Sequence, residues 1–213
     1  MKNLISKYRT TIEMILFGIL CFLTGATNAQ TVDTVIHSIA YTSYFNYSLH
    51  EPLYVQYKLI NGGGNCSRTG DHFISGGLKN SATAQDYKGG GYDEGHLADS
   101  KDFAYDCSLQ KATFFFYNCV PQTPKLNRGS WKQLETKARK ESQGDTLNIY
   151  CGGIFTTKKL KNIAVPAQCW KVVFSKNGLL HCDIFPNDNS NIDTPIPLDS
   201  LKKIIPYRVE WPN

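Results

Sequence analysis

Short runs of apolar and β-branched residues, ended by glycine, proline or asparagine, recur along the chain and predict β-strands. The clearest alternation covers residues 53–59 and stops at the Asn61-Gly62-Gly63-Gly64 run. Two further runs flank Asn177-Gly178, a dipeptide typical of tight hairpin turns. The other predicted strands cover residues 113–117, 147–151 (stopped by Gly152-Gly153), 170–174 and 179–185.

Helical periodicity is confined to two segments. Residues 128–141 place Trp131, Leu134 and Ala138 on one stripe with charged residues elsewhere, and a shorter helix is predicted over 198–204. Strands outnumber helices without βαβ alternation, which predicts an α+β domain with a central antiparallel sheet.

Two polar segments, 61–91 and 187–197, read as irregular loops. Long loops inside a compact domain are often functional, although an exposed connection is the commoner explanation.

The first 29 residues have the pattern of an export signal. Lys2, Lys7 and Arg9 precede a short apolar run, and small residues follow as far as Ala29. We expect cleavage after Ala29, with an uncleaved anchor as the alternative, and one domain over residues 30–213. No other segment is long and apolar enough to span a bilayer. We therefore expect a secreted or periplasmic protein with no stable membrane association after signal removal.

Cysteine content changes the picture once the leader is set aside. An even number of cysteines on an exported chain favours disulfides, up to three, in an oxidising compartment. These cysteines are Cys66, Cys107, Cys119, Cys151, Cys169 and Cys182. Their spacing does not select a pairing. A zinc site is the weaker alternative, because there is no CxxC pair and only His181 adjoins a cysteine.

Candidate chemistry is concentrated in the middle of the chain. His96 follows a glycine turn, Asn118 ends a predicted strand, and Asn127 lies near the start of a helix that carries Glu135 and Arg139 one turn apart. A histidine can activate water near neutral pH, and amide and carboxylate oxygens suit Mg²⁺. With a nearby arginine, such groups could cleave a phosphodiester. The alternative is a structural histidine, a capping asparagine and a solvated ion pair, and spacing alone does not decide.

Three motifs in fixed order carry a resemblance to a known family. The chain contains Asp93-Glu94-Gly95-His96, then Asn118-Cys119-Val120-Pro121-Gln122, then the LNRGSWKQLE sequence of residues 126–135. These resemble D-R-G-H, N-x-x-P-Q and L-N-x-G-x-W-x-x-L-E of the DNA/RNA non-specific endonucleases, the ββα-metal (His-Me finger) family that includes mitochondrial endonuclease G. Weaker similarity extends from about residue 44 to residue 211. The resemblance implies a ββα-metal active-site motif between a strand end and the 128–141 helix.

The resemblance also implies a role for each matching residue. His96 would be the general base that deprotonates the attacking water. Asn127 would be the only direct protein ligand of a hydrated Mg²⁺, or of Mn²⁺. Glu135 would hold a metal-bound water, Arg139 would lie beside the phosphate, and Asn118 would orient the site by fixing His96.

Two further positions face the phosphate in the family. Arg68 stands where the family has a phosphate-facing arginine, in a loop that aligns loosely. Glu94 stands where the family usually has arginine, so an anion replaces a cation near the phosphate. Loss of one transition-state contact of this kind commonly costs about 3 kcal/mol. The exchange therefore bears on rate, metal preference and substrate affinity, while base, metal ligand and water-holding glutamate remain.

The sequence as a whole predicts an exported, Mg²⁺-dependent endonuclease that cuts DNA and RNA with little sequence preference. The chain is mildly basic, with a formal net charge of +5 that includes its leader, which permits an anionic partner without requiring one. Basic residues around the predicted metal helix would attract a phosphate backbone: Lys125, Arg128, Lys132, Lys137 and Lys140. A second basic group, Lys158, Lys159 and Lys161, is better explained as a solvated face.

The alternative is a secreted, disulfide-stapled binding protein on the same fold, in which Glu94 marks lost catalysis. Retention of His96, Asn127 and Glu135 together favours the enzyme. The sequence leaves the oligomeric state open.

Overall fold

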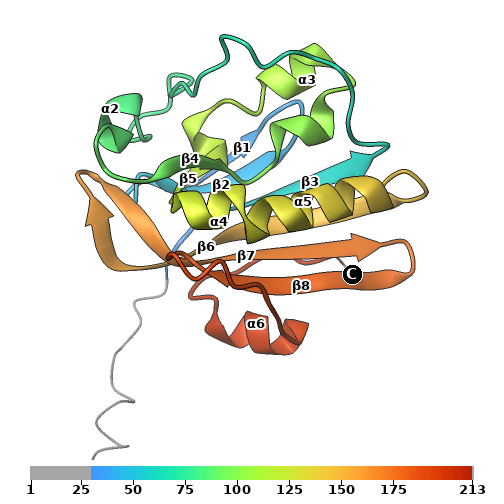
Figure 1. Ribbon diagram of the computed structural model, residues 1–213. Coiled ribbons are helices and arrows are strands. Elements are labelled where there is room, and N and C mark those ends of the chain that lie inside the picture. The colour runs from blue at the N-terminus through green and yellow to red at the C-terminus, as the bar shows by residue number, and fades with distance from the viewer. Residues whose placement is uncertain (1–29, 213) are drawn as a thin grey trace, which may run out of the picture.

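The computed structural model describes residues 30–212, so the expected leader lies outside the described residues. A large antiparallel sheet forms the centre of the fold (Figure 1), in the strand order β1-β2-β3-β6-β7-β8-β9. Its strands are β1 (Thr34–His37), β2 (Thr42–Asn46), β3 (Glu51–Ile60), β6 (Thr146–Leu160), β7 (Ile163–Ser175), β8 (Gly178–Pro186) and β9 (Thr194–Pro195). The predicted α+β class with a central antiparallel sheet is confirmed.

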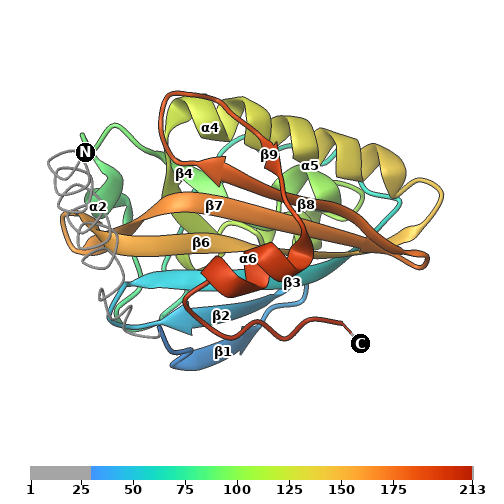
Figure 2. The same ribbon diagram turned by 90° about the horizontal axis from the view of Figure 1, so that it is seen from below.

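A second, two-stranded sheet and two helices cover one face of the large sheet. Strands β4 (Asp93–His96) and β5 (Cys119–Gln122) pair antiparallel, and α4 (Pro124–Arg128) and α5 (Ser130–Glu141) follow directly. Figure 2 shows α6 (Leu198–Ile204) on the opposite face, at the place and length that its sequence predicts.

Helix α5 is fixed to the sheet by its apolar stripe. Trp131, Leu134 and Ala138 are all buried in the main core, and the Trp131 ring lies 5.4 Å from that of Phe185 on β8. The predicted 128–141 helix is thus confirmed, except that Gly129 divides it from the short α4. Side chains on the outer face of α5 are therefore presented from a rigid support.

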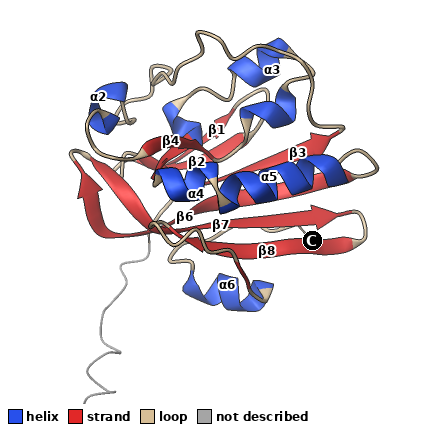
Figure 3. Ribbon diagram, in the orientation of Figure 1, coloured by secondary structure: helices blue, strands red, loops and turns tan. Residues whose placement is uncertain are grey.

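The remaining helices are short and lie in the irregular region between β3 and β5 (Figure 3). They are α2 (Ala84–Tyr87), α3 (Cys107–Lys111) and the 3₁₀ turns Ser100–Phe103 and Phe116–Asn118. The two polar segments, 61–91 and 187–197, are mostly irregular, as their composition predicts.

The hairpin predicted around Asn177-Gly178 joins β7 to β8, and Gly178 takes a φ of 114° there. The expected end of β6 at Gly152-Gly153 is wrong, because β6 continues to Leu160. A Cβ at Gly152 would lie 2.2 Å from the Leu53 carbonyl oxygen of β3. This glycine therefore permits a close approach inside the sheet instead of a turn.

The strand predicted over 113–117 is also wrong. Only Phe115 makes a bridge, to Ile74, and a 3₁₀ turn begins at Phe116. Phe114 and Phe116 instead pack with Phe73 in a small second core beneath the 61–91 loop. The apolar run reflects this local core and not a sheet position.

Cysteine pairing departs from the expectation of up to three disulfides. Cys66 and Cys107 form a bridge with Cα atoms 5.3 Å apart. The other cysteines of residues 30–212 are buried and do not pair with one another: Cys119, Cys151, Cys169 and Cys182. They lie on strands and pack as small apolar side chains. None of the described helices is long and apolar enough to cross a membrane.

Candidate active site

A polar cleft of about 670 Å³ opens between the 68–73 loop, β4 and the α4–α5 pair. Five of the six site residues that the sequence predicts line this cleft: Arg68, His96, Asn127, Glu135 and Arg139. Residues more than 70 positions apart in the sequence therefore meet at one place.

His96 ends β4 and is only 9% exposed. Its ring packs against Phe73 and Phe114, with centroids 4.5 Å and 4.8 Å away. Burial, together with the charges of Arg68 and Lys171, lowers the pKa of His96 to about 3, although Asp99 acts in the opposite direction. The imidazole is therefore neutral at physiological pH.

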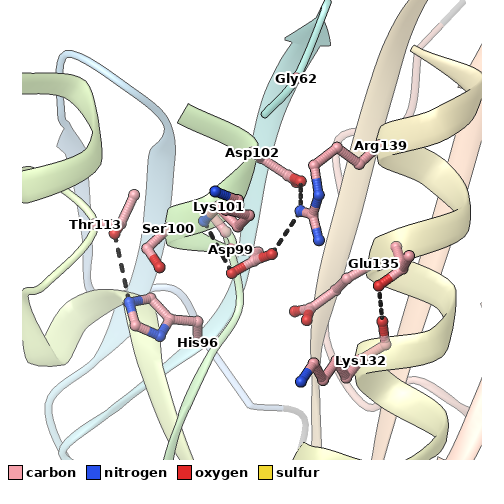
Figure 4. A network of polar contacts seen from close by, with 12 residues as sticks. Gly62, His96, Asp99, Ser100, Lys101, Asp102, Thr113, Lys132, Glu135 and Arg139 are labelled. Atoms are coloured by element: carbon pink, nitrogen blue, oxygen red, sulfur yellow. Dashed lines mark hydrogen bonds and ion pairs between the residues drawn. The ribbon is translucent and has the colours of Figure 1, made fainter. Parts of the chain in front are cut away.

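Thr113 selects the tautomer of that imidazole. Its hydroxyl donates to the Gln110 carbonyl oxygen at 2.7 Å and lies 3.4 Å from His96 Nε2. Because the single hydroxyl hydrogen is already used, Thr113 can only accept from His96. The geometry assigns the ring hydrogen to Nε2 and leaves Nδ1 as the basic nitrogen (Figure 4).

Asn118 lies behind the cleft and does not line it. Its side chain accepts from the Ala98 amide at 2.8 Å and donates to the carbonyl oxygens of Ala98 and Thr113, both at 2.9 Å. It thus joins the backbone that follows His96 to the residue that contacts the imidazole. Asn118 thus contacts the neighbours of His96 and makes no hydrogen bond of its own to the ring.

Asn127 is held by the carboxylate of Asp93. Its Nδ2 donates to Asp93 Oδ2 at 2.9 Å, and Arg128 binds the same carboxylate through Nε and Nη2 at 2.8 Å and 2.6 Å. Burial raises the pKa of Asp93, but the hydrogen bonds from Arg128 and Asn127 outweigh it and the pKa is lowered. Since Nδ2 is fixed, the amide oxygen remains as an acceptor at the cleft, which suits a hard cation.

Glu135 projects from α5 into the cleft and is 7% exposed. Buried Lys171 reaches it from β7, with Nζ 3.5 Å from Glu135 Oε1 and 4.2 Å from the centre of the Trp131 ring. Burial and the charge of Asp99 raise the pKa of Glu135 to about 8, while Lys171 and Arg139 oppose the rise. At neutral pH Glu135 is therefore largely protonated, and a cation bound in the cleft would displace that proton and lower the pKa.

Arg139, one turn further along α5, is fixed by two carboxylates (Figure 4). Its Nη1 lies 2.7 Å from Asp99 Oδ2 and also pairs with Asp102. Burial raises the pKa of Asp99, but the charge of Arg139 outweighs it and lowers that pKa. The guanidinium is therefore charged and held in one place on the cleft wall.

Arg68 and Glu94 face the same cleft with opposite charges. Exposed Arg68 places its guanidinium carbon 5.4 Å from the centre of the Phe114 ring. Glu94, half-buried on β4, makes no hydrogen bond with any described residue, and burial raises its pKa. The Glu94 side chain therefore faces the cleft, at the position where the family usually has arginine.

Sequence reasoning did not single out Asp99, Asp102, Thr113 or Lys171. The two aspartates follow His96 closely in a polar turn, which is the signal that could have marked them. Lys171 interrupts the apolar strand run 170–174, and a lysine in a buried strand implies a partner charge. Thr113 carries no signal of its own.

Similarity to known proteins agrees with the geometry of the cleft. The family model for DNA/RNA non-specific endonucleases matches residues 23–209. The chain therefore belongs to the DNA/RNA non-specific endonuclease family.

Curated relatives include a nuclease of Nostoc sp., 42% identical over 90 residues, which covers 41% of this chain and 33% of the relative. Human mitochondrial endonuclease G is 27% identical over 135 residues, or 55% of this chain and 46% of that protein. The chain thus spans less than half the length of these two relatives.

The fold is also found among solved structures. A crystal structure of the EndoG/EndoGI complex superimposes with a TM-score of 0.70 at 20% identity, covering 83% of this chain and 85% of the other. At this identity the likeness concerns the fold, which supports the arrangement of sheet, β4–β5 and α5 described above.

Proposed function

We propose that this protein is a metal-dependent nuclease that hydrolyses phosphodiester bonds in DNA and RNA. The observation that carries the proposal is the meeting of an enclosed His96, the amide oxygen of Asn127 and the side chain of Glu135 at one cleft. The names of the nuclease relatives support the same class of reaction.

Mg²⁺, or Mn²⁺, fits the donors of this cleft. Asn127 would hold the ion directly through Oδ1, and Glu135 would bind one of its waters, which leaves most of the hydration shell in place. The ion would supply positive charge to the phosphate and leaving oxygen.

The protein's own residues carry the remaining steps. His96 Nδ1 takes the proton from the attacking water, because Nε2–H is held by Thr113. Arg139, locked by Asp99 and Asp102, presents a fixed charge to the phosphate. Asn118 holds the backbone that follows His96 to the backbone of Thr113.

Substrate selection rests on charge. Arg68, Lys101 and Lys132 line the cleft in addition to the paired Arg128 and Arg139, and these cations would bind phosphate oxygens whatever the base sequence. Acidic residues line the cleft as well, so the attraction is local to the cations: Asp71, Asp93, Glu94, Asp99 and Glu135. We therefore propose cleavage of both DNA and RNA with little sequence preference.

We also propose that the protein is exported, to the periplasm or the medium. The basic and apolar pattern of residues 1–29 supports export. The Cys66–Cys107 bridge agrees with an oxidising compartment.

One observation favours a second candidate, a binding protein without turnover. Glu94 lines the cleft with an unpaired carboxylate and would repel a phosphate. The decisive experiment incubates the protein from Gln30 onward, oxidised and folded, with plasmid DNA and with RNA, in Mg²⁺ or in EDTA.

His96→Ala provides the comparison. We expect loss of both substrates in Mg²⁺ only, abolished in His96→Ala although that variant still folds and binds metal. A folded wild-type protein that cleaves neither substrate with any divalent ion would favour the binding protein.

A further inference from the structure

The polar loop after β8 lies against the helix pair that carries Asn127. Figure 2 shows the segment between β8 and β9 passing beside α4. In the sequence this loop is separated from α4 by about sixty residues, so its contacts with α4 are tertiary.

The loop holds the beginning of α4 through Asn187. This buried side chain accepts from the Thr123 amide at 2.8 Å and donates to the carbonyl oxygens of Pro121 and Pro166, also at 2.8 Å. The Thr123 hydroxyl donates to the Asp188 carbonyl oxygen at 2.7 Å. The residue that precedes α4 is therefore fixed to both β5 and the loop.

The loop also holds the far end of α4, where α5 begins. Asn191 Oδ1 accepts from the Ser130 amide at 2.6 Å. Helix α5 has Gly129 at its N-cap, which offers no side chain, and Asn191 supplies an acceptor to the amide of Ser130, one of the first-turn amides that have no partner within the helix. Asn191 itself has a φ of 55°, a conformation that asparagine tolerates better than most residues.

Contact at this point is close. A Cβ on Gly129 would lie 1.9 Å from Asn191 Oδ1 and 2.3 Å from the Lys125 carbonyl oxygen. No space is therefore left for the α4–α5 junction to move toward the loop. Asn127 lies between the two clamped ends, at Thr123 and Ser130.

We propose that Asn191, supported by Asn187, is a positioning residue for the metal site: it caps α5 and thereby fixes Asn127 at the cleft. Asp93 sets the rotation of the Asn127 amide, whereas the loop sets the position of the backbone that carries it. The inference rests on the proposed role of Asn127 as metal ligand.

The test measures Mn²⁺ binding by electron paramagnetic resonance of the free ion, on purified protein without nucleic acid. Asn191→Gly keeps the positive φ accessible and removes the acceptor, and it is expected to weaken Mn²⁺ binding about tenfold, as loss of a supporting contact commonly does. Asn80→Gly is the matched control, because Asn80 is exposed, does not line the cleft and has a φ of 56°. It is expected to bind Mn²⁺ as wild type does.

Asn191→Asp keeps an oxygen acceptor at the same φ and is expected to bind within about twofold of wild type. This variant decides the matter if Asn191→Gly does not fold, since Mn²⁺ binding lost in a folded Asn191→Asp would overturn the proposal. A folded Asn191→Gly with lowered melting temperature but wild-type Mn²⁺ binding would also overturn it, because the cap would then be structural only.

Failure of the proposed function gives a different result. A wild-type protein that binds Mn²⁺ but does not cleave would remove the nuclease and leave the capping inference intact, provided that Asn191→Gly weakens binding. Cleavage by wild type with unchanged Mn²⁺ binding in Asn191→Gly would support the nuclease and overturn the capping inference.

Discussion

At the scale of single residues, enclosure determines the protonation of His96. The rings of Phe73 and Phe114 bury the imidazole and keep water away from it. The charge of Lys171, behind the site, disfavours a second positive charge there. The ring therefore stays neutral in the folded protein over a pH range in which a histidine of the unfolded chain becomes charged. This difference has a measurable consequence for stability.

His96 should make the folded protein sensitive to acid. Its pKa is about 3 when folded and about 6.5 when unfolded, so the unfolded state takes up the proton first as pH falls. Its contribution is fully present above about pH 6.5 and is lost below it at roughly 1.4 kcal/mol per pH unit. Guanidinium unfolding in EDTA at pH 6.5 and pH 5 should show that wild type loses about 2 kcal/mol more than His96→Asn. Equal losses in the two proteins would contradict the buried, neutral state.

Asp93 should matter for metal binding through Asn127. Asp93→Ala frees the Asn127 amide to rotate, and we expect the Mg²⁺ concentration for half-maximal cleavage to rise about tenfold. Arg128→Ala is the control, since it removes the exposed ion pair and keeps the Asp93–Asn127 bond. Equal effects of the two substitutions would indicate that the ion pair, and not the amide contact, sets the metal requirement.

Motif residues could be predicted from the sequence, but their supporting partners could not. His96, Asn127 and Glu135 stand in short motifs whose spacing can be recognised in a single sequence. Asp102 and Lys171 act only because the fold brings them to Arg139 and Glu135, from a 3₁₀ turn and from a central strand. The polar turn after His96 and the lysine in an apolar strand indicate that a charge needs a partner, but only the fold shows which residue that partner is.

At the scale of elements, the short break between α4 and α5 has no room for added volume. Gly129→Ala would place a methyl group against Asn191 and the Lys125 carbonyl oxygen, so the loop or the helix must shift. We expect a loss of about 2 kcal/mol in the free energy of unfolding, together with weaker metal binding. Gly144→Ala, in the turn after α5 with open space around it, is the control and should be nearly neutral. Thermal unfolding and Mn²⁺ titration of both variants check the prediction.

The predicted helices and strands are right where the apolar positions follow one helical or strand period. They are wrong where apolar residues pack in a local core outside any regular element. The helix over 198–204 has the predicted bounds, because its amphipathic turns are followed by Pro206. The 113–117 run is as apolar as a buried strand, yet Phe114 and Phe116 belong to the small core around Phe73. Hydrophobic runs report burial, and only the fold decides whether a sheet or a loop core provides it.

At the scale of the whole molecule, the disulfide joins the loop with Arg68 to the rest of the fold. Cys66 and Cys107 are 41 residues apart, and the Cys66 amide also donates to the Ala104 carbonyl oxygen at 3.0 Å. Arg68 lies two residues beyond this anchor and lines the cleft. The bridge therefore limits both the unfolded chain and the freedom of an arginine that lines the cleft.

The double variant Cys66→Ser/Cys107→Ser should be less stable by about 4 kcal/mol, the loop-closure cost for a bridge of this span. Its KM for DNA should rise several-fold, because Arg68 is no longer held, while Mn²⁺ binding at Asn127 should change little. Dithiothreitol should lower the melting temperature of wild type to that of the variant. It should leave the variant itself unchanged, since its four buried cysteines do not pair with one another. A variant that dithiothreitol destabilises further would have to contain a second bridge, and the single-disulfide arrangement would be wrong.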